Sequence, residues 1–287
     1  MTATAAGTLP SATRGRPRRV VALAWLHDNL LFLYTGFAVL YLLLPVAIII
    51  LFSFNDPAGR SNFVWQGFTV KYWANPLAVI GLGDAVLTSL EIAFISTAVA
   101  TMLGTLIALA LVRYQFLGRG ATNMLITLPM ATPEIVLGAS LLTMFVAIGG
   151  PPFFPLNFVT ILIAHVMFNI SYVVVTVRAR LSGFPRHLEE AAMDLGANEW
   201  TTFWKVTFPL ILPGIIAAAL LAFSLSIDDF VVTNFTSGKT QTFPMFIYAK
   251  ARIGVPVQVN VIGTIIFLTA VGAVLISTLL QRRDRSR

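Results

Sequence analysis

The sequence predicts an all-α membrane protein with six transmembrane helices. Hydrophobic residues make up 57% of the 287 residues and charged residues only 11%, whereas charged residues are roughly 25% of an ordinary soluble domain. The few charges are clustered, so six apolar stretches remain that reach the length of about 20 residues needed to cross a bilayer. These two observations favour an integral membrane protein over one or two soluble domains.

The six predicted spans are Leu30–Phe52, Ala85–Val112, Ala121–Ile148, Phe158–Val177, Ile211–Phe235 and Gln258–Leu280. They form one transmembrane domain over 28–280, between a disordered tail over 1–27 and a short tail over 281–287. The first run is too long for the apolar core of a signal peptide and no small-residue cleavage site follows it, so we expect a retained helix. Pro129 and Pro133 predict a kink within the third span.

The basic residues predict which side of the membrane each loop faces. An even number of spans puts both termini on one side, together with the turn over 113–120 and the loop over 183–214. That side carries 14 of the 19 Lys and Arg residues. The loops over 53–84 and 236–257, on the other side, carry the remaining five. Because cytoplasmic loops carry the basic excess, both termini and the 183–214 loop are expected in the cytoplasm. The net charge of +7 is then explained by the topology and by attraction of the basic loops to anionic lipid, and it does not indicate nucleic-acid binding.

The sequence offers no motif for catalysis or metal binding. It has no cysteine, which excludes disulfides, thiolate metal sites and cysteine nucleophiles. His27, His165 and His187 lack metal-ligand spacing and are interpreted as structural. Gly238-Lys239-Thr240 matches the end of a P-loop, but Thr233 stands where the first glycine must fall. We therefore expect no catalytic residue, metal or cofactor in this chain.

The most informative stretch is the polar loop over 183–214. Helical spacing joins four apolar residues into one stripe: Leu188, Ala191, Ala192 and Leu195. Glu189 and Glu190 lie in the first turn of this predicted short helix, where the helix dipole favours negative charge. Gly196 follows the stripe, at the position where a left-handed cap would end the helix.

A second short helix is predicted directly after this one. Asn198 would cap it and Pro209 would end it. One face of it carries Trp200, Phe203, Trp204 and Thr207. Two short amphipathic helices joined at a glycine indicate a docking surface for a partner protein. The alternative interpretation is a helical hairpin that lies on the lipid interface.

This loop resembles the EAA loop of ABC-importer permeases. Glu190-Ala191-Ala192, three residues, Gly196, nine residues, Val206, one residue and Phe208-Pro209 follow the family pattern, with Val206 and Phe208 replacing the usual Ile and Leu. The resemblance implies the core of type I, or MetI-like, importer permeases. It also implies that seven residues couple the chain to an ATPase: Glu189, Glu190, Ala191, Ala192, Asp194, Gly196 and Trp200.

By the same resemblance, the chain would pair with a second, homologous permease. Two cytoplasmic ATPase subunits, which bind ATP and Mg²⁺, and an extracytoplasmic substrate-binding protein would complete the transporter. The pore would lie between the two permeases and would work by alternating access. The rival class is a proton-coupled secondary carrier. Against it, the six spans show no evident half-to-half repeat, and such a carrier does not need the loop motif.

Four acidic residues fall at membrane depth, where a charge is expensive and therefore marks a functional candidate: Glu91, Glu134, Asp228 and Asp229. Glu91 lies near the outer end of its helix and is expected to snorkel or to pair with a loop. Glu134 lies near mid-membrane and would either pack against a partner helix or line a pathway. Asp228 and Asp229, in the outer third of the fifth span, would point about 100° apart and share no face. They favour a mouth that attracts cations, with capping or a loop lysine as the alternative for one of them.

Three further segments resemble spermidine/putrescine permeases: Leu128–Val136, Ala222–Val232 and Phe243–Tyr248. The likeness covers about Leu30 to Leu280. It departs at Ser237-Gly238-Lys239-Thr240, where relatives usually have a Gly-Pro-Gly turn. The resemblance implies a polyamine substrate, with another small nitrogenous or organic solute as the second choice. Asp228, Asp229 and Glu134 are then the candidate residues of the substrate pathway.

Overall fold

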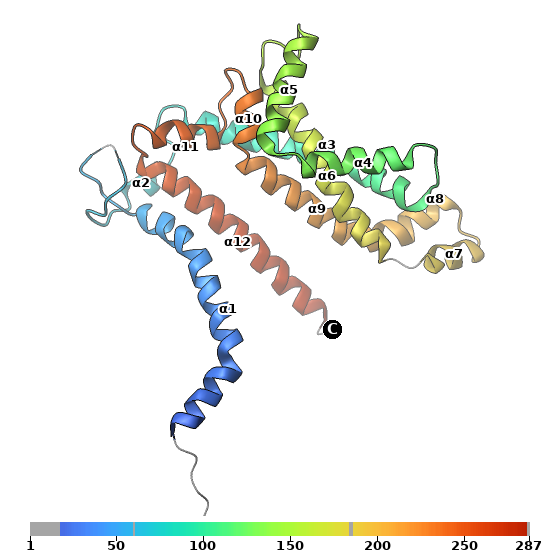
Figure 1. Ribbon diagram of the computed structural model, residues 1–287, viewed down its shortest axis with the longest axis horizontal. Helices are drawn as coiled ribbons and strands as arrows, with labels where there is room; N and C mark the ends of the chain where they lie inside the picture. Colours follow the sequence, from blue (N-terminus) through green and yellow to red (C-terminus); the bar gives the residue numbers. More distant parts are fainter. Residues whose placement is uncertain (1–17, 60, 184–185, 286–287) are drawn as a thin grey trace, which may run out of the picture.

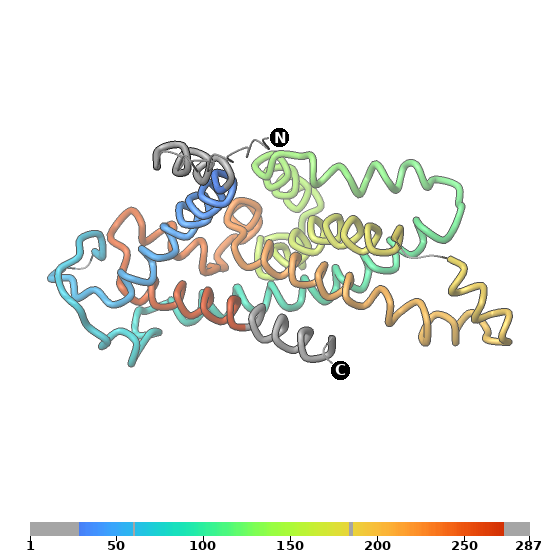
Figure 2. The backbone as a smooth tube through the Cα atoms, turned by 90° about the horizontal axis from the view of Figure 1, so that it is seen from below, coloured from blue at the N-terminus to red at the C-terminus, as the bar shows by residue number. Residues whose placement is uncertain are grey.

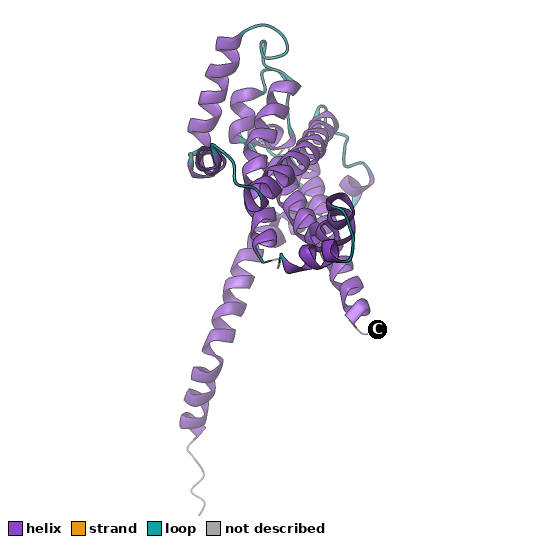
Figure 3. Cartoon of the chain, turned by 90° about the vertical axis from the view of Figure 1, so that its right-hand side faces the viewer, coloured by secondary structure: helices purple, strands orange, loops and turns teal. Residues whose placement is uncertain are grey.

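The computed structural model describes the backbone of residues 18–59, 61–183 and 186–285, and the side chains of residues 29–59, 61–183 and 186–272. Every regular element in these ranges is a helix (Figure 3), so the predicted all-α class is confirmed. The first helix begins at Arg18, inside the predicted N-terminal tail, and residues 1–17 of that tail lie outside the described residues. The last helix continues to Arg285, through most of the predicted C-terminal tail.

Three helices run side by side at the centre of the molecule (Figure 1): α3 (Leu82–Arg113), α6 (Phe158–Ser182) and α9 (Phe208–Asp228). The buried face of α3 is a stripe of small residues that includes Ala85, Ser89, Ala93, Ser96, Ala100, Gly104 and Ala108. Small side chains let membrane helices approach closely. At Gly104 a Cβ atom would lie 2.6 Å from Val173 Cγ1 on α6, so this contact tolerates no side chain.

The chain passes the membrane several times. Four helical segments in the described part are long and apolar enough to cross: Asn29–Phe52, Leu82–Arg113, Phe158–Ser182 and Glu199–Asp228. The sixth predicted span lies within α12 (Val257–Arg285), whose part with described side chains, Val257–Gly272, is apolar on average but shorter than a full span. The helix α1 (Arg18–Phe52) packs against α12 and extends away from the central three helices (Figure 1).

The third predicted span is wrong as a single helix. It consists of α4 (Arg119–Ala131) and α5 (Glu134–Ile148), which meet at 112°. Proline disfavours helical geometry in the residue before it, and Thr132, before Pro133, is extended with φ −82° and ψ 131°. The sequence predicted the kink but not its size.

The fifth predicted span, Ile211–Phe235, differs at both ends. Pro209 does not end the second short helix, because α8 (Glu199–Thr202), a π-helical turn (Phe203–Thr207) and α9 form one continuous segment. The wider π turn precedes Pro209, where a regular turn would place a carbonyl against the proline ring. At its other end α9 stops at Asp228, and α10 (Val231–Thr236) begins after a break.

The two long loops lie at the end of the molecule opposite α7 (His187–Asp194) and α8 (Figure 2). In the 53–84 loop, which includes α2 (Lys71–Ala74), the ring of Phe54 stacks on Phe68 and Trp73 with centroids 5.5 and 5.2 Å apart. The predicted 236–257 loop is partly helical, since it contains α11 (Phe243–Ala251). The helix α11 contacts α3 and α9, and α2 contacts α12.

Candidate functional site

The three predicted pathway acids, Glu134, Asp228 and Asp229, line one cavity of about 650 Å³. Its walls come from the break between α4 and α5, from Phe168 and Tyr172 on α6, and from the break between α9 and α10. The sequence places Glu134 near mid-membrane and the aspartates in the outer third. The 112° bend before Glu134 brings all three acids to the same cavity. Glu91, the fourth candidate, is exposed on α3 and does not line this cavity.

The break after α9 explains why both aspartates line the cavity, against the prediction that they share no face. That prediction assumed a continuous helix. The helix ends at Asp228, and Asp229 is extended with φ −63° and ψ 124°. The two side chains still differ in surroundings. Asp228 is exposed, whereas the side chain of Asp229 is only 9% exposed.

Asp229 is held by the first turn of α10. Its carboxylate accepts hydrogen bonds from the backbone N–H of Thr233 at 2.8 Å, from the Thr233 hydroxyl at 2.7 Å and from the N–H of Val232 at 3.4 Å. A helix N-terminus favours a carboxylate through its free N–H groups and its dipole. The capping alternative therefore applies to Asp229, and no such bond ties Asp228 to α10 in the described residues.

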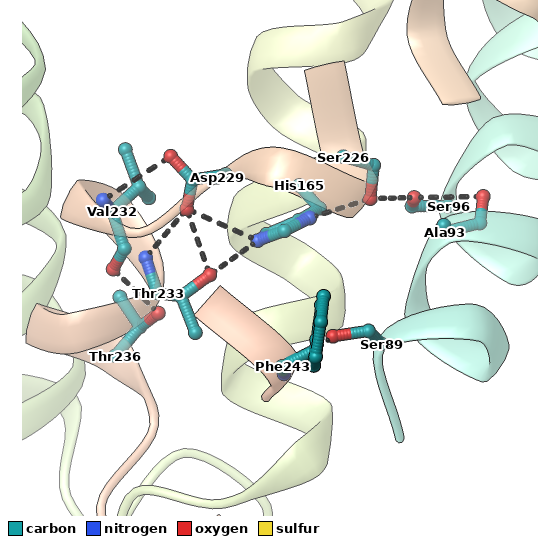
Figure 4. A network of polar contacts seen from close by, with 10 residues as sticks. All are labelled: Ser89, Ala93, Ser96, His165, Ser226, Asp229, Val232, Thr233, Thr236 and Phe243. Carbon is teal, nitrogen blue, oxygen red and sulfur yellow. Dashed lines mark hydrogen bonds and ion pairs between the residues drawn. The ribbon is translucent and has the colours of Figure 1, made fainter. Parts of the chain in front are cut away.

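His165 joins Asp229 to the centre of the molecule (Figure 4). Its ring lies between Ser226, whose Oγ is 2.7 Å from Nδ1, and Thr233, whose Oγ1 is 2.9 Å from Nε2. Ser226 in turn lies 3.0 Å from Ser96 Oγ on α3. One polar chain thus links α3, α6, α9 and α10. From the sequence we interpreted His165 as structural and did not predict this network, because two of its hydrogen-bonded partners, Ser96 and Ser226, are 130 positions apart.

Aromatic rings complete the cavity. Phe168, Tyr172 and Phe230 are among its lining residues, and the Phe230 ring packs on Tyr248 with centroids 4.6 Å apart. Exposed carboxylates beside aromatic faces suit an organic cation, since a cation over a ring gains about 0.5–2 kcal/mol. Among the described residues no group of three or more His, Asp and Glu side chains could hold a metal ion.

The second candidate region is the hairpin formed by α7 and α8. The predicted left-handed cap is confirmed, because Gly196 has φ +89°. The N–H of Ala197 donates to Ala192 O and the N–H of Gly196 to Met193 O, the bond pair of a Schellman motif. Asn198 caps α8 as predicted, since its side chain accepts from the N–H of Thr201 at 2.8 Å. Local sequence rules therefore determine the turn of this hairpin.

Glu189 and Glu190, although adjacent, have different surroundings. Glu189 accepts a hydrogen bond from Arg113 Nη2 at the end of α3 at 2.8 Å, and one from the Thr207 hydroxyl at 2.7 Å. Glu190 is exposed, and its carboxylate lies 3.5 Å from the exposed guanidinium of Arg186. Glu189 thus attaches α7 to the rest of the chain, and Glu190 is accessible to a partner.

The remaining predicted coupling residues form an exposed surface on the hairpin. Ala191 and Asp194 are exposed and Ala192 is half-buried. Leu195 and Trp200 are 89% and 70% exposed, and the Trp200 ring packs edge-on against Trp204 at 5.7 Å. Large exposed apolar side chains beside charged ones indicate a surface that is covered in the assembled state. Either a partner protein or lipid would cover this surface.

The chain is similar in sequence to known transport proteins. Residues 100–285 match the family described as binding-protein-dependent transport system inner membrane component. The chain is 36% identical over 254 residues to the spermidine/putrescine transport system permease protein PotC of Haemophilus influenzae, covering 88% of this chain and 96% of that protein. It is 38% identical over 250 residues to the putrescine transport system permease protein PotI of Escherichia coli, covering 86% and 87%.

Solved structures share the fold. A bacterial alginate ABC transporter, in complex with a periplasmic protein bound to alginate pentasaccharide, contains a chain that matches with a TM-score of 0.65 at 18% identity. The match covers 93% of this chain and 97% of that chain. The inward-facing MetNI methionine ABC transporter matches with a TM-score of 0.53 over 71% of this chain and 95% of that chain. At this level of identity the likeness concerns the fold, which is that of type I ABC importer permeases.

Proposed function

Because this chain belongs to the family of binding-protein-dependent transport system inner membrane components, we propose that it is the permease subunit of an ABC importer for polyamines. The observation that carries the substrate class is the cavity between the two helix breaks. Three carboxylates and several aromatic rings line it. A polyamine carries two or more positive charges and needs such partners as its water is removed. Asp228 and Glu134 are the proposed contacts, and Asp229 contributes its charge from a fixed position.

The proposed transporter contains further chains. A second, homologous permease would complete the pore, and an extracytoplasmic binding protein would deliver the solute. Two ATPase subunits would bind Mg²⁺ and ATP, so this chain would hydrolyse nothing itself. The α7–α8 hairpin is the proposed contact with an ATPase, through Glu190, Ala191, Asp194, Gly196 and Trp200. Lipid surrounds the remaining apolar surface, and no nucleic acid is involved.

The fold supports a direct mechanical link between the two regions. The segment Glu199–Asp228 is helical throughout, so a helix of about 45 Å connects the hairpin to the cavity at 1.5 Å per residue. Glu189 also ties α7 to Arg113 at the end of α3 and to Thr207 before α9. Movement of the hairpin would therefore displace α3 and α9 together. Rigid-body tilting of these helices would open the cavity alternately to the two sides.

The proposed orientation places both termini and the α7–α8 hairpin in the cytoplasm, on the basis of the bias of Lys and Arg. Reporter fusions after Gly183 should then show a cytoplasmic location, and fusions near Lys239 an extracytoplasmic one. A cytoplasmic location for Lys239 would contradict the order of spans on which the pathway depends. This measurement does not depend on the substrate.

The function itself is tested by uptake. The chain, its partner permease, the ATPases and the binding protein are reconstituted in liposomes, and entry of radiolabelled spermidine is followed with ATP inside. We expect uptake that requires both ATP and the binding protein. If the complex carries only a neutral or anionic solute, the polyamine assignment is wrong and the importer assignment stands. Uptake driven by a proton gradient without ATP would contradict the importer.

A further inference from the structure

His165 occupies an unusual place for an ionisable side chain. It is 1% exposed, lies at the centre of a polar chain that joins four helices, and has its Nε2 atom 3.5 Å from Asp229 Oδ2 (Figure 4). Asp229 in turn lines the acidic cavity. A buried polar network of this kind is costly unless each member is satisfied. The geometry therefore restricts which atoms of the ring carry protons.

The carboxylate at the end of the network sets the direction of the hydrogen bonds. An ionised carboxylate only accepts, so the Thr233 hydroxyl uses its one proton for Asp229 Oδ2, at 2.7 Å. That hydroxyl must then accept from His165, 2.9 Å away, which places a proton on Nε2. The 3.5 Å separation of Nε2 from Asp229 agrees, because an unprotonated nitrogen would direct a lone pair at the carboxylate.

The other ring nitrogen decides the charge of His165. Ser226 Oγ lies 2.7 Å from Nδ1, and if its hydroxyl donates, the ring is neutral. Ser226 then accepts from Ser96 at 3.0 Å, so the single hydroxyl proton of Ser96 serves this shorter contact and not the 3.3 Å contact with Ala93 O. Asp229 already receives three hydrogen bonds from the first turn of α10, so it needs no cation to satisfy it. A second charge at an almost fully buried membrane position is also expensive. Both considerations favour the neutral ring.

We propose that His165 is a positioning residue for Asp229, and that it acts as a neutral imidazole with its proton on Nε2. Its bond to Thr233 fixes the hydroxyl that holds the carboxylate, and its neutrality leaves the charge of Asp229 uncancelled at the cavity wall. This inference rests on the proposed function, because an uncancelled negative charge is what a polyamine requires there. A protonated ring would instead form an ion pair with Asp229 and weaken the attraction of the cavity for a cation. Asp228 and Glu134 are the other carboxylates that line the cavity.

The protonation state is tested without any transport measurement. The chain has three histidines, so the protein is labelled with ¹⁵N-histidine and its ring nitrogens are observed by NMR in the assembled complex. The His165 resonances are those that disappear in His165→Gln. We expect a neutral ring protonated at Nε2 at pH 7. A doubly protonated ring, or a proton on Nδ1 alone, would overturn the proposal.

The positioning role is tested by spermidine uptake in a double-mutant cycle. His165→Ala and Thr233→Val should each raise the apparent KM by about tenfold with a smaller change in kcat, while Thr233→Ser, which keeps the hydroxyl, should stay within about twofold of wild type. Because the effect passes through Asp229, His165→Ala combined with Asp229→Asn should transport like Asp229→Asn alone. Additive losses, or unchanged KM values in both His165→Ala and Thr233→Val, would contradict the role.

Two controls keep the proposal separate from folding and from the proposed function. If His165→Ala does not insert, Thr233→Val, which is close in shape to threonine, provides the same comparison with Thr233→Ser. If the wild-type complex carries no spermidine, the polyamine function fails. In that case the NMR experiment still decides the state of His165 by itself.

Discussion

The α7–α8 hairpin and the acidic cavity lie at opposite ends of the helical segment Glu199–Asp228, and each presents two adjacent carboxylates. In both regions one carboxylate is held by the protein and its neighbour is exposed. Glu189 is held and Glu190 is exposed at the hairpin, whereas Asp229 is held and Asp228 is exposed at the cavity. The exposed carboxylates, Glu190 and Asp228, are available to contact a partner protein or a solute.

The two held carboxylates differ in their partners. Glu189 faces the guanidinium of Arg113, which cancels its charge, and both side chains are about 15% exposed. Asp229 is held by neutral donors from Thr233, Val232 and, through Thr233, His165. An ion pair suits a contact that only has to hold two helices together, because such a contact needs no net charge. Neutral donors fix the position of a carboxylate without cancelling its negative charge. Such a carboxylate can still attract a cation at the wall of a pathway.

The largest expected effect comes from disrupting the hairpin surface. Gly196→Val places a β-branched residue at φ +89°, at a cost of about 1–3 kcal/mol, and Glu190→Lys reverses the exposed charge. We expect either variant to abolish uptake, and ATP hydrolysis to lose its stimulation by the loaded binding protein. Gly120→Val is the matched control, since Gly120 also has open space around it but no left-handed φ. Normal uptake by both hairpin variants at normal expression would exclude a docking role.

The next effect is expected from the exposed aspartate of the cavity. Asp228→Asn removes one negative charge that faces the incoming cation, and we expect spermidine uptake to fall about tenfold, which corresponds to about 1.4 kcal/mol. Asp84→Asn makes the same chemical change at the exposed first turn of α3, outside the cavity, and should leave uptake near wild type. Equal losses in the two variants would show that general surface charge, and not the cavity, attracts the substrate.

A moderate effect is expected from separating the hairpin from α3. Glu189→Gln removes the negative charge of the Glu189–Arg113 ion pair at a site that is mostly covered, so we expect a loss of about 1–3 kcal/mol in stability and a several-fold loss of uptake. The doubly substituted Glu189→Gln, Arg113→Gln protein should recover part of this loss. Thermal unfolding of the purified complex and the uptake assay measure the two quantities. If the losses of Glu189→Gln and Arg113→Gln simply add in the double variant, the two residues do not form a pairwise joint.

The smallest effect is expected at Glu134. It is exposed at the first position of α5, where the helix dipole favours an acid by about 0.3–1 kcal/mol. Because the positive end of the helix dipole partly offsets the charge of Glu134, we expect Glu134→Gln to change the KM for spermidine by only about twofold. A loss as large as that of Asp228→Asn would contradict this ranking and show that Glu134 contributes as much to substrate binding as Asp228.

The hairpin was more predictable from the sequence than the cavity, for a physical reason. Gly196 and Asn198 act on backbone groups within five residues, so their roles follow from local rules. The cavity depends on the angle between α4 and α5 and on contacts between helices distant in the sequence. Pro133 indicates a kink, but packing of α5 on α10 through Gly138 and Phe235 accompanies its 112° bend. The apolar pattern of the fifth span likewise gave no sign of the break at Asp229.

The measurement that tests this division of roles most directly compares uptake with ATP hydrolysis in the same liposomes. In Asp228→Asn we expect hydrolysis stimulated by the binding protein to remain above about half of wild type while spermidine uptake falls about tenfold, so that more ATP is used per spermidine. In Glu190→Lys we expect both quantities to be lost together. If Asp228→Asn loses stimulated hydrolysis in proportion to uptake, or if Glu190→Lys retains uptake, the cavity and the hairpin do not have the separate roles assigned to them.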